Sequence, residues 1–295
     1  IIIFKINNIF NIIMDNKELS PQGNFTKSNI ILGKGSYKTV YEGFNTLIGK
    51  KIAWNSVDVG FMTERDIDMI KNEISTLNSF NNECTYIINF HGCWYNQHNT
   101  NVVFITELAS SGTLKSFRNE MEIVSLEAFN RWFIQVFKGM LFLHNRNIIH
   151  RDIKGENIFI NGNTGDIKIG DLGLSFKYKR LNNNSVVGTP EFMAPELFDG
   201  DYDNKIDIYA VGLTMLEIYT NKTPYEECQN IVKIWKNKMN NYFPKILDLI
   251  NNNQLKDIIK NCTHFDPLQR PNIGELLNDN FFIINTIIND DNYYI

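Results

Sequence analysis

The stretch Ile149-His150-Arg151-Asp152-Ile153-Lys154-Gly155-Glu156-Asn157 decides the fold of this chain. From His150 onwards it matches the pattern H-R-D-L-x-x-x-N, with Ile153 in place of the leucine. Within it, the carboxylate of Asp152 is followed by the ammonium group of Lys154 and the amide of Asn157. Carboxylate and amide oxygens are hard ligands of the kind that magnesium prefers. The stretch therefore predicts a loop that carries chemistry.

Two further triplets follow this loop in a set order. The strand-like segment Ile167-Lys168-Ile169 leads to Asp171-Leu172-Gly173, and Ala194-Pro195-Glu196 closes the region. Each triplet alone is a weak signal. Together, in this order and after the first stretch, they form a specific signature.

Upstream, a glycine-rich loop departs from its usual pattern. Residues 33–40 follow G-x-G-x-x-G-x-V, except that Lys38 stands where the third glycine is expected. Glycines in such a loop let the backbone close over phosphate groups. One strand later, Ile52-Ala53-Trp54-Asn55 fits the pattern V-A-I-K except at its last residue. One lysine is thus missing from its expected place, and another stands in place of a glycine.

The spacing of these two departures suggests that they are connected. Alternating residues predict a strand over 39–44, a turn over 45–49 and a strand over 50–59. If the turn centres near Leu47, Lys38 lies opposite about residue 56, next to Asn55. Cross-strand neighbours on one face have Cβ atoms about 5 Å apart. A lysine on the earlier strand could therefore point into the same pocket as one on the later strand.

The composition is that of an ordinary globular protein. The chain has 295 residues, 43% of them hydrophobic, and a formal net charge of −4. This charge offers no general reason to expect nucleic acid or an anionic membrane as a partner. No apolar run reaches the roughly 18 residues that cross a bilayer. The four cysteines show no CxxC and no metal-ligand spacing, which predicts free thiols in a reduced, cytoplasmic protein.

Tails are expected at both ends of the chain. Residues 1–14 lack the basic start and cleavage site of a signal peptide, and Met14 is a candidate for the native start. We expect a tail over 1–29, one domain over 30–283 and a second tail over 284–295. Within the domain, the Ser110-Ser111-Gly112 break predicts a boundary between lobes 30–109 and 110–283.

Periodicity predicts the main elements of both lobes. Further strands are expected over 30–32, 86–90 and 102–108. Apolar residues at helical spacing predict helices over 62–80, 126–144, 203–220, 226–239, 254–262 and 273–277. The helix over 203–220 is apolar on most sides and should be buried at the centre of its lobe.

With these motifs in this order, the chain resembles the eukaryotic protein kinases over residues 30–282. The resemblance implies an α+β, two-lobed fold: a small β-rich N-lobe with one main helix and a larger, mostly α-helical C-lobe. It implies an enzyme that uses ATP and Mg²⁺, with Mn²⁺ as an alternative, to phosphorylate proteins. Asp207 resembles the aspartate that braces the catalytic loop, and Arg270 resembles the arginine that pairs with Glu196.

The same resemblance assigns roles to individual residues. Phosphoryl transfer depends on positioning and charge neutralisation. Asp152 would accept or orient the proton of the substrate hydroxyl, and Lys154, typical of serine/threonine kinases, would neutralise the transferred phosphate. Asn157 and Asp171 would bind the metal ion. The other candidates for nucleotide binding are Gly33, Gly35, Ser36, Val40, Ala53, Thr106 and Glu107.

Three explanations compete for the missing lysine. The chain could be a catalytically dead pseudokinase, a nucleotide-binding scaffold, although its intact Asp152, Asn157 and Asp171 argue against this. Lys50 or Lys51 could serve instead, but four residues of strand place the latter about 13 Å from position 55. In the third explanation, Lys38 reaches in from the second strand.

The third explanation describes the with-no-lysine (WNK) kinases. The chain is similar to them in Gly35-Ser36-Tyr37-Lys38-Thr39-Val40, in Thr106-Glu107-Leu108, and in the run from Ser185 to Glu196. It departs from them at Asn55, where animal members tend to carry cysteine. By this resemblance Lys38 is the catalytic lysine, and Glu73 is its partner on the N-lobe helix.

The WNK resemblance also implies regulation and partners. Ser185 matches the activation-loop phosphorylation site, whose phosphate could pair with Arg151. Chloride is an inhibitory ion in the family, which would bind here near Leu172, Gly173 and Leu174; Phe90 would lie nearby, and Phe104 replaces a smaller leucine. Protein substrates, including downstream kinases, and a transient homodimer during autophosphorylation are implied, without nucleic-acid binding or membrane insertion.

Overall fold

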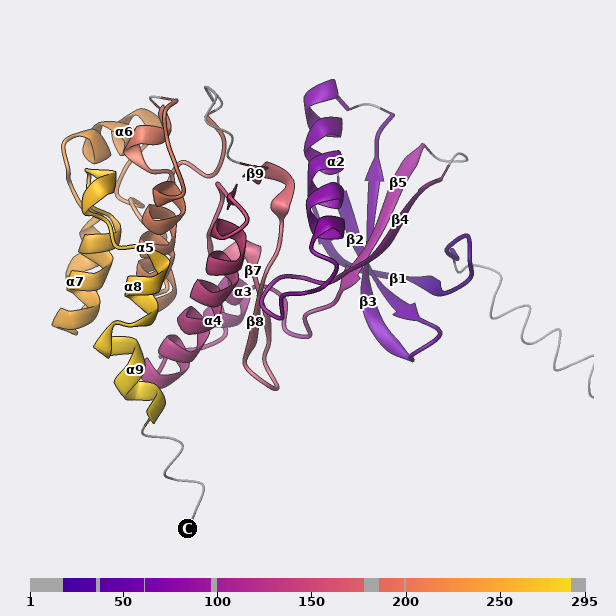
Figure 1. The fold of residues 1–295 in the computed structure, drawn as a ribbon, viewed down its shortest axis with the longest axis horizontal. Coiled ribbons are helices and arrows are strands. Elements are labelled where there is room, and N and C mark those ends of the chain that lie inside the picture. Colours follow the sequence, from indigo (N-terminus) through magenta and orange to yellow (C-terminus); the bar gives the residue numbers. More distant parts are fainter. Residues whose placement is uncertain are drawn as a thin grey trace, which may run out of the picture. The chain divides into compact units, whose positions relative to one another are not determined.

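The chain divides into two compact units (Figure 1). The structure is a computed structural model that describes residues 18–35, 38–60, 62–96, 100–177, 186–198 and 200–287. The N-terminal unit contains the residues up to 81 together with 89–108, and the C-terminal unit contains 82–88 and the residues from 109 onwards. The chain therefore passes briefly through the second unit before it returns to the first. The domain limits given above stay predictions.

The N-terminal unit is built on an antiparallel sheet with the strand order β1-β2-β3-β5-β4. Its strands are β1 (Phe25–Lys34), β2 (Lys38–Asn45), β3 (Lys50–Asp58), β4 (Phe90–Asn96) and β5 (Asn101–Glu107). The helix of this unit, α2 (Glu64–Ser79), begins with a capping box. The Thr63 hydroxyl accepts the Asp66 N–H, and the Asp66 carboxylate accepts the Thr63 N–H.

The two faces of this sheet have different compositions. Ile52, Trp54, Val103 and Ile105 form a buried cluster on one face, where the rings of Trp54 and Trp94 meet edge to face. Side chains alternate between faces along a strand, so the neighbouring positions point the other way. That other face carries Lys38 and lies towards α2, because Glu73 of α2 contacts Lys38.

The C-terminal unit is mainly helical. Its helices are α3 (Leu114–Asn119), α4 (Leu126–His144), α5 (Lys205–Thr220), α6 (Ile231–Met239), α7 (Asn253–Cys262), α8 (Ile273–Leu277) and α9 (Asn280–Ile287). Two short antiparallel pairs join β6 (Ile148–Ile149) to β9 (Phe176–Lys177) and β7 (Ile158–Asn161) to β8 (Asp166–Ile169). Every residue of α5 from 206 to 218 is buried, which confirms the prediction of a central buried helix.

Several predicted elements differ from the observed ones. The first strand begins five residues earlier than expected, because residues 25–27 also pair with β2. The predicted strand over 86–90 is wrong: Ile87 makes only an isolated bridge to Ile169, and β4 begins at Phe90. The helix predicted over 226–239 begins only at Ile231, where the Asn230 side chain caps the Lys233 N–H. The sequence did not predict α3, α9 or the short strands β6, β7 and β9.

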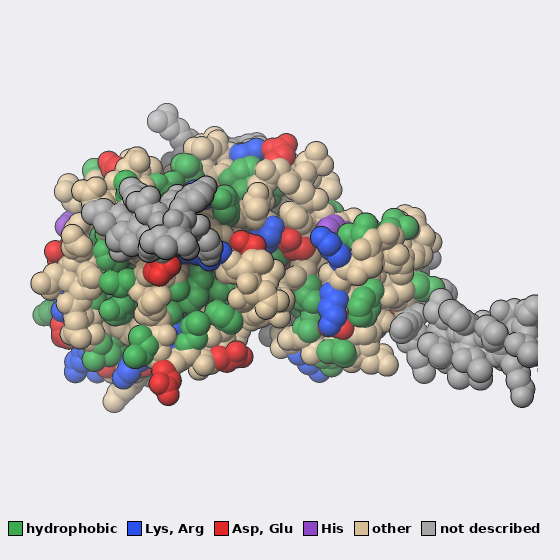
Figure 2. Space-filling view, turned by 90° about the horizontal axis from the view of Figure 1, so that it is seen from below, with side chains coloured by type: hydrophobic (Ala, Val, Ile, Leu, Met, Phe, Trp, Pro, Cys, Tyr) green, Lys and Arg blue, Asp and Glu red, His purple; other side chains and the backbone are tan. Residues whose placement is uncertain are grey.

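Across the described ranges, no helix is both long enough and apolar enough to cross a membrane. On the face seen in Figure 2, Lys and Arg side chains are interspersed with Asp and Glu side chains. No single sign of charge dominates this face.

Candidate active site

Lys38 and Glu73 meet within the N-terminal unit. Lys38 is the first residue of β2, and its Nζ lies 3.2 Å from Oε1 and 3.4 Å from Oε2 of Glu73. Glu73 is buried on α2, whereas the side chain of Lys38 is 30% exposed. A buried carboxylate needs a cationic partner, and the displaced lysine supplies it. The structure thus brings together the two residues that the sequence paired.

The strand register explains how Lys38 reaches this position. Lys38 pairs with Val57 and Val40 pairs with Asn55, one residue away from the register expected from the sequence. Directly opposed residues share a face of the sheet, and a slip by one residue would move Lys38 to the other face. With the observed register, Lys38 and Asn55 share one face, two residues apart along the strands.

The amide nitrogen of Asn55 points into the sheet. It is buried, and its Nδ2 atom lies 3.2 Å from the Phe104 carbonyl oxygen, 3.3 Å from the Thr106 hydroxyl and 3.4 Å from the Ala53 carbonyl oxygen. These neighbours hold the side chain within the sheet. The residue at the usual lysine position therefore has a local structural role.

Phe104 is a second neighbour of Lys38 that sequence reasoning did not find. It pairs with Asn55 across β3 and β5, it is buried, and its ring centroid lies 5.5 Å from Lys38 Nζ. A cation at this distance over an aromatic face is attracted by the ring quadrupole. Lys38 is thus held between a carboxylate and a ring. The sequence showed only that Phe104 is larger than the leucine usual at this position.

The glycine loop leaves space for a ligand. A Cβ atom at Gly33 would meet no heavy atom within 4 Å, and one at Gly35 would meet only the Lys38 carbonyl oxygen, at 3.5 Å. Packing within the protein therefore does not require glycine at either position, which fits a close approach of phosphate groups. Ser36 lies outside the described residues.

The remaining nucleotide-binding candidates of this unit lie in the sheet. Val40 is in β2, opposite Asn55, and Ala53 and Thr106 are buried partners across β3 and β5. The Glu107 carboxylate accepts the backbone N–H of Asn89 at 2.7 Å. Their contact with a nucleotide stays a prediction.

In the C-terminal unit, Asp152 is the centre of a compact polar group. Its Oδ2 lies 2.8 Å from Asn157 Nδ2 and 3.2 Å from Lys154 Nζ. Its Oδ1 accepts the backbone N–H of Thr189 at 2.9 Å and the Thr189 hydroxyl at 2.8 Å. Lys154 Nζ also donates to the Thr189 hydroxyl at 2.5 Å. Sequence reasoning placed Asp152, Lys154 and Asn157 together but missed the direct contact with Thr189.

Helix α5 holds the loop that carries this group. Both oxygens of Asp207 accept backbone N–H groups at 2.9 Å, Oδ2 from His150 and Oδ1 from Arg151. Arg151 has the left-handed φ of 68°, a strained conformation for arginine that these bonds stabilise. The ring of His144 lies 2.9 Å from Asp207 Oδ2. Burial opposes ionisation of Asp207, but the hydrogen bonds and charges of His144 and His150 outweigh it and lower the pKa of Asp207.

A second carboxylate of α5 holds the same loop about three turns further on. Glu217 Oε2 accepts the Gly155 N–H at 3.3 Å, and its Oε1 forms an ion pair of 2.8 Å with Lys115 of α3. Burial raises the pKa of Glu217, and the Lys115 charge opposes this rise. Between Asp207 and Glu217 on the helix, the Thr214 hydroxyl donates to the Ile153 carbonyl at 3.3 Å. One buried helix therefore positions the loop at three points.

Asp171 and the following turn form the other predicted part of the site. Asp171 is exposed and has the left-handed φ of 56°, and Leu172–Leu174 form one 3₁₀ turn. Arg151 donates from Nε to the Leu174 carbonyl at 2.6 Å and from Nη1 to the Tyr202 hydroxyl at 3.1 Å. Its predicted phosphate partner, Ser185, lies outside the described residues.

Metal binding by Asn157 and Asp171 stays a prediction. In the part of the chain that the structure describes, no three His, Cys, Asp or Glu side chains gather into a metal cage. Magnesium usually binds through one or two protein oxygens together with substrate phosphates and water. Asn157 and Asp171 could supply the protein oxygens of such a site.

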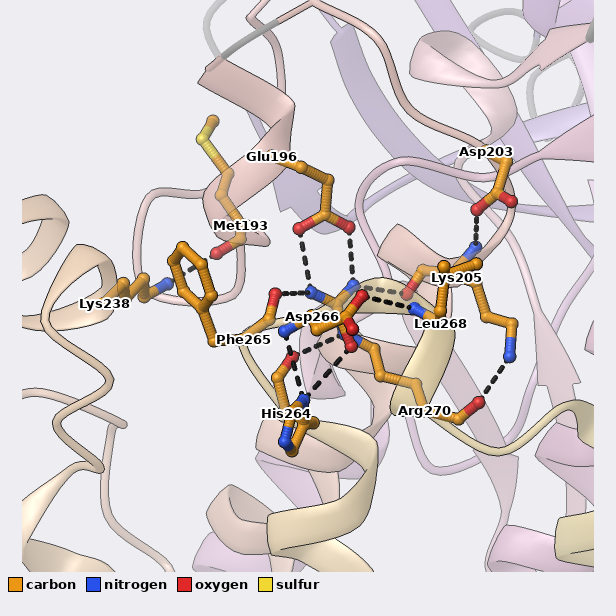
Figure 3. A network of polar contacts seen from close by, with 10 residues as sticks. All are labelled: Met193, Glu196, Asp203, Lys205, Lys238, His264, Phe265, Asp266, Leu268 and Arg270. Atoms are coloured by element: carbon orange, nitrogen blue, oxygen red, sulfur yellow. Dashed lines mark hydrogen bonds and ion pairs between the residues drawn. The ribbon is translucent and has the colours of Figure 1, made fainter.

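The segment that follows Thr189 is anchored by two buried cations (Figure 3). The Arg270 guanidinium makes a two-pronged contact with Glu196, at 2.5 and 2.8 Å, as the sequence predicted. Lys238 of α6 is 2% exposed, and its Nζ donates to the carbonyl oxygens of Pro190, Glu191 and Met193 at 2.7–2.9 Å. Nothing in the sequence marked Lys238, because a lysine on an amphipathic helix usually faces solvent.

Comparisons with known proteins agree with this geometry. The family model described as "Protein kinase domain" matches residues 26–282. The "Probable serine/threonine-protein kinase WNK5" of Oryza sativa subsp. japonica is 39% identical over 90% of this chain and 82% of its own length. The "Probable serine/threonine-protein kinase WNK10" of Arabidopsis thaliana is 38% identical over 90% of this chain and 51% of its own length. The "Serine/threonine-protein kinase WNK3" of Mus musculus is 38% identical over 90% of this chain but only 15% of its own length. The chain thus spans about half the length of the Arabidopsis relatives it matches.

Proposed function

Because this chain belongs to the protein kinase family, and within it to the WNK kinases, we propose that it transfers the γ-phosphoryl group of ATP to serine or threonine hydroxyls of proteins, with Lys38 as the catalytic lysine. The observation that carries this proposal is the ion pair between Lys38 of β2 and Glu73 of α2. A lysine at this place presents its charge to the same face of the sheet as a lysine at position 55 would.

In the N-terminal unit, Lys38 binds and orients the nucleotide phosphates. Glu73 pairs with the ammonium group and limits its rotamers, and the Phe104 ring limits them further. Preorganised charges of this kind stabilise the charge that develops on transferred phosphoryl oxygens. Gly33 and Gly35 allow the backbone to approach the phosphates, since neither has a Cβ atom in the way.

In the C-terminal unit, Asp152 orients the substrate hydroxyl and accepts its proton. The contacts of Asn157 and Thr189 fix the orientation of its carboxylate. Lys154, 3.2 Å from Asp152, supplies positive charge to the phosphoryl group in transfer. Asn157 and Asp171 would hold magnesium, which supplies further positive charge to the phosphates when it is bound.

The first test is the substitution Lys38→Met in the purified chain. Loss of the ammonium group should reduce autophosphorylation with ATP and Mg²⁺ at least a hundred-fold, because a preorganised charge contributes about 3 kcal/mol or more. Circular dichroism should show an unchanged fold, and Asp152→Ala provides the second inactive control. Full turnover by Lys38→Met would refute the assignment of Lys38. A wild-type chain that binds ATP without any turnover would instead be a pseudokinase.

Regulation by phosphate is the next part of the proposal. Ser185 is the proposed activating site, with Arg151 as partner of its phosphate, and it would be phosphorylated within a transient homodimer. Arg151 already joins the Leu174 carbonyl to the Tyr202 hydroxyl, so a phosphate would compete with or add to these bonds. Mass-spectrometric mapping of active protein should find phosphate on Ser185; fully active protein that is bare there would contradict this.

Chloride inhibition is proposed for the turn Leu172–Leu174, whose backbone supplies N–H groups. Phe104 is larger than the leucine expected there and already packs against Lys38. We therefore expect wild-type autophosphorylation to respond less to 0–150 mM chloride than that of Phe104→Leu. Equal responses of the two proteins would show that Phe104 does not affect chloride inhibition.

Downstream kinases as substrates and a cytoplasmic location are proposed on the family resemblance alone. In vitro phosphorylation tests the first proposal, and cell fractionation tests the second.

A further inference from the structure

The C-terminal unit contains a basic cavity apart from the residues proposed for catalysis. It has a volume of about 380 Å³. One wall is the outer side of α4, with Arg131, Gln135 and Lys138. The other walls are the start of β8 and the Thr85–Tyr86 segment. All these residues belong to the same compact unit.

Hydrogen bonds fix the walls relative to each other. The Gln135 amide donates to the Gly165 carbonyl at 3.0 Å and accepts the Ile167 N–H at 3.0 Å, which joins α4 to the β7–β8 hairpin. The Arg131 guanidinium donates to the Thr164 carbonyl. The Ile169 N–H donates to the Tyr86 carbonyl at 2.9 Å, which joins β8 to the third wall. The cavity is therefore formed before any ligand arrives, which reduces the entropy lost on binding.

The charge of the cavity is opposite to that of the whole chain. Arg131, Lys138 and Lys168 line it, with Asp166 as the acidic member. The Asp166 carboxylate accepts the Thr164 hydroxyl at 2.5 Å. The chain as a whole carries a net charge of −4. A local excess of positive charge in a concave site attracts anions.

The walls also provide apolar surface. Lys138 Nζ lies 5.5 Å from the centroid of the Tyr86 ring and 3.5 Å from its hydroxyl, and Ile134 and Ile167 complete the lining. A bare inorganic anion would leave this surface without a partner. A peptide that combines carboxylates with an apolar side chain would use both.

We propose that this cavity binds an acidic peptide segment of a partner protein. Arg131 and Lys138 are seven residues apart on α4, a separation of about 10 Å along the helix. An extended peptide advances about 3.3 Å per residue and its residues i, i+2 and i+4 share one face, so two carboxylates four residues apart, about 13 Å, lie within reach of the two long cationic side chains. Arginine and lysine bind carboxylates by charge-assisted hydrogen bonds, and an aliphatic residue between the carboxylates lies against Tyr86 and Ile134.

The test measures binding of a fluorescein-labelled peptide by anisotropy. The peptide has two glutamates four residues apart with a leucine midway between them, and it lacks serine, threonine and tyrosine. It cannot be phosphorylated, so the result does not depend on the proposed kinase activity. We expect the wild-type chain to bind it at least ten-fold more tightly than a peptide in which both glutamates are glutamines.

Paired variants locate the binding site. Arg131→Glu with Lys138→Glu should weaken binding at least ten-fold, whereas Lys233→Glu with Lys236→Glu, two exposed lysines of α6, should change it less than two-fold. Both pairs change the net charge equally. Arg131→Gln with Lys138→Gln serves if the charge reversals disturb folding. Equal losses in the cavity and control variants would show non-specific attraction and overturn the proposal, as would equal binding of the glutamine peptide or no binding of either.

Discussion

At the residue scale, the displaced lysine depends on the surroundings of a single ammonium group. Lys38 Nζ lies 3.2 Å from a buried carboxylate and 5.5 Å from a buried ring. The carboxylate of Glu73 requires a cation there, because an unpaired buried charge is strongly destabilising. Asn55 accommodates the change by directing its amide to carbonyl and hydroxyl oxygens of the sheet. The charge has moved between strands while its partner on α2 has stayed.

The substitution Phe104→Leu tests whether the ring positions Lys38. A cation–π contact of this kind contributes about 1 kcal/mol, so the KM for ATP should rise roughly five-fold. The kcat should change less, because the contact holds Lys38 in both the ground and the transition state. Steady-state kinetics at saturating protein substrate measures both constants.

Phe104→Tyr keeps a ring at the same position and serves as the control. Its KM should stay within two-fold of the wild-type value. If the tyrosine variant shows the same increase as the leucine variant, the ring quadrupole is not the cause.

At the element scale, α5 is the support of the catalytic loop. Asp207, Thr214 and Glu217 lie along one buried helix and contact the loop at 150–151, 153 and 155. Helical spacing places residues seven and ten apart on neighbouring parts of one face. A buried helix seldom unwinds at its ends, so α5 holds the loop, and with it Asp152, in one position. In the same way, α6 supports the segment after Thr189 through Lys238.

Lys238→Met should weaken the recognition of protein substrates. The substitution keeps the length of the side chain but leaves one buried and two partly buried carbonyl groups without their donor, and each buried group without a partner costs about 1–3 kcal/mol. We expect the melting temperature to fall and the KM for a peptide substrate to rise at least ten-fold, with the KM for ATP nearly unchanged.

Lys236→Met, on the exposed side of the same helix, is the matched control for this experiment. It should leave the melting temperature and both KM values as they are in the wild type. Equal effects of the two substitutions would mean that α6 acts through its general charge.

At the scale of the whole molecule, stability should depend on the ionisation of Asp207. Its pKa in the folded chain lies below the usual value of 3.8, so the folded state prefers the carboxylate more than the unfolded state does. The resulting stabilisation is fully present above pH 3.8 and is lost as the pH falls through the lower folded-state pKa.

The substitution Asp207→Asn isolates this effect. At pH 7 the variant should unfold about 3 kcal/mol more easily than the wild type, because charged hydrogen bonds to two backbone N–H groups are lost. The difference should begin to shrink below pH 3.8, where the carboxylate of the unfolded wild-type chain becomes protonated, and should continue to shrink down to the lower folded-state pKa. Urea unfolding between pH 3 and 7 measures it, and a difference independent of pH would contradict the assignment.

Much of the fold and of the candidate site could be predicted from the amino-acid sequence alone. Helical spacing located α4 and α5, because their apolar residues recur at positions that only a helix brings to one face. The order of the motifs identified the kinase family, and the family model matches residues 26–282. Local signals of this kind depend on residues close in sequence. The same signals failed for residues 226–230 and 86–90, where a cap and an isolated bridge replaced the expected helix and strand.

Contacts between residues far apart in sequence required the tertiary structure. The sequence proposed Lys38 for the missing charge, but the register of β2 and β3 decided which face it occupies. The sequence marked Phe104 only as larger than the usual leucine and did not mark Lys238 at all, because their neighbours lie 66 and about 45 residues away along the chain. The basic cavity likewise forms only when α4, β8 and the Thr85–Tyr86 segment come together. The periodicity of apolar residues shows which residues close in sequence share one face of a helix or strand. Which distant residues pack against that face is decided by the tertiary structure.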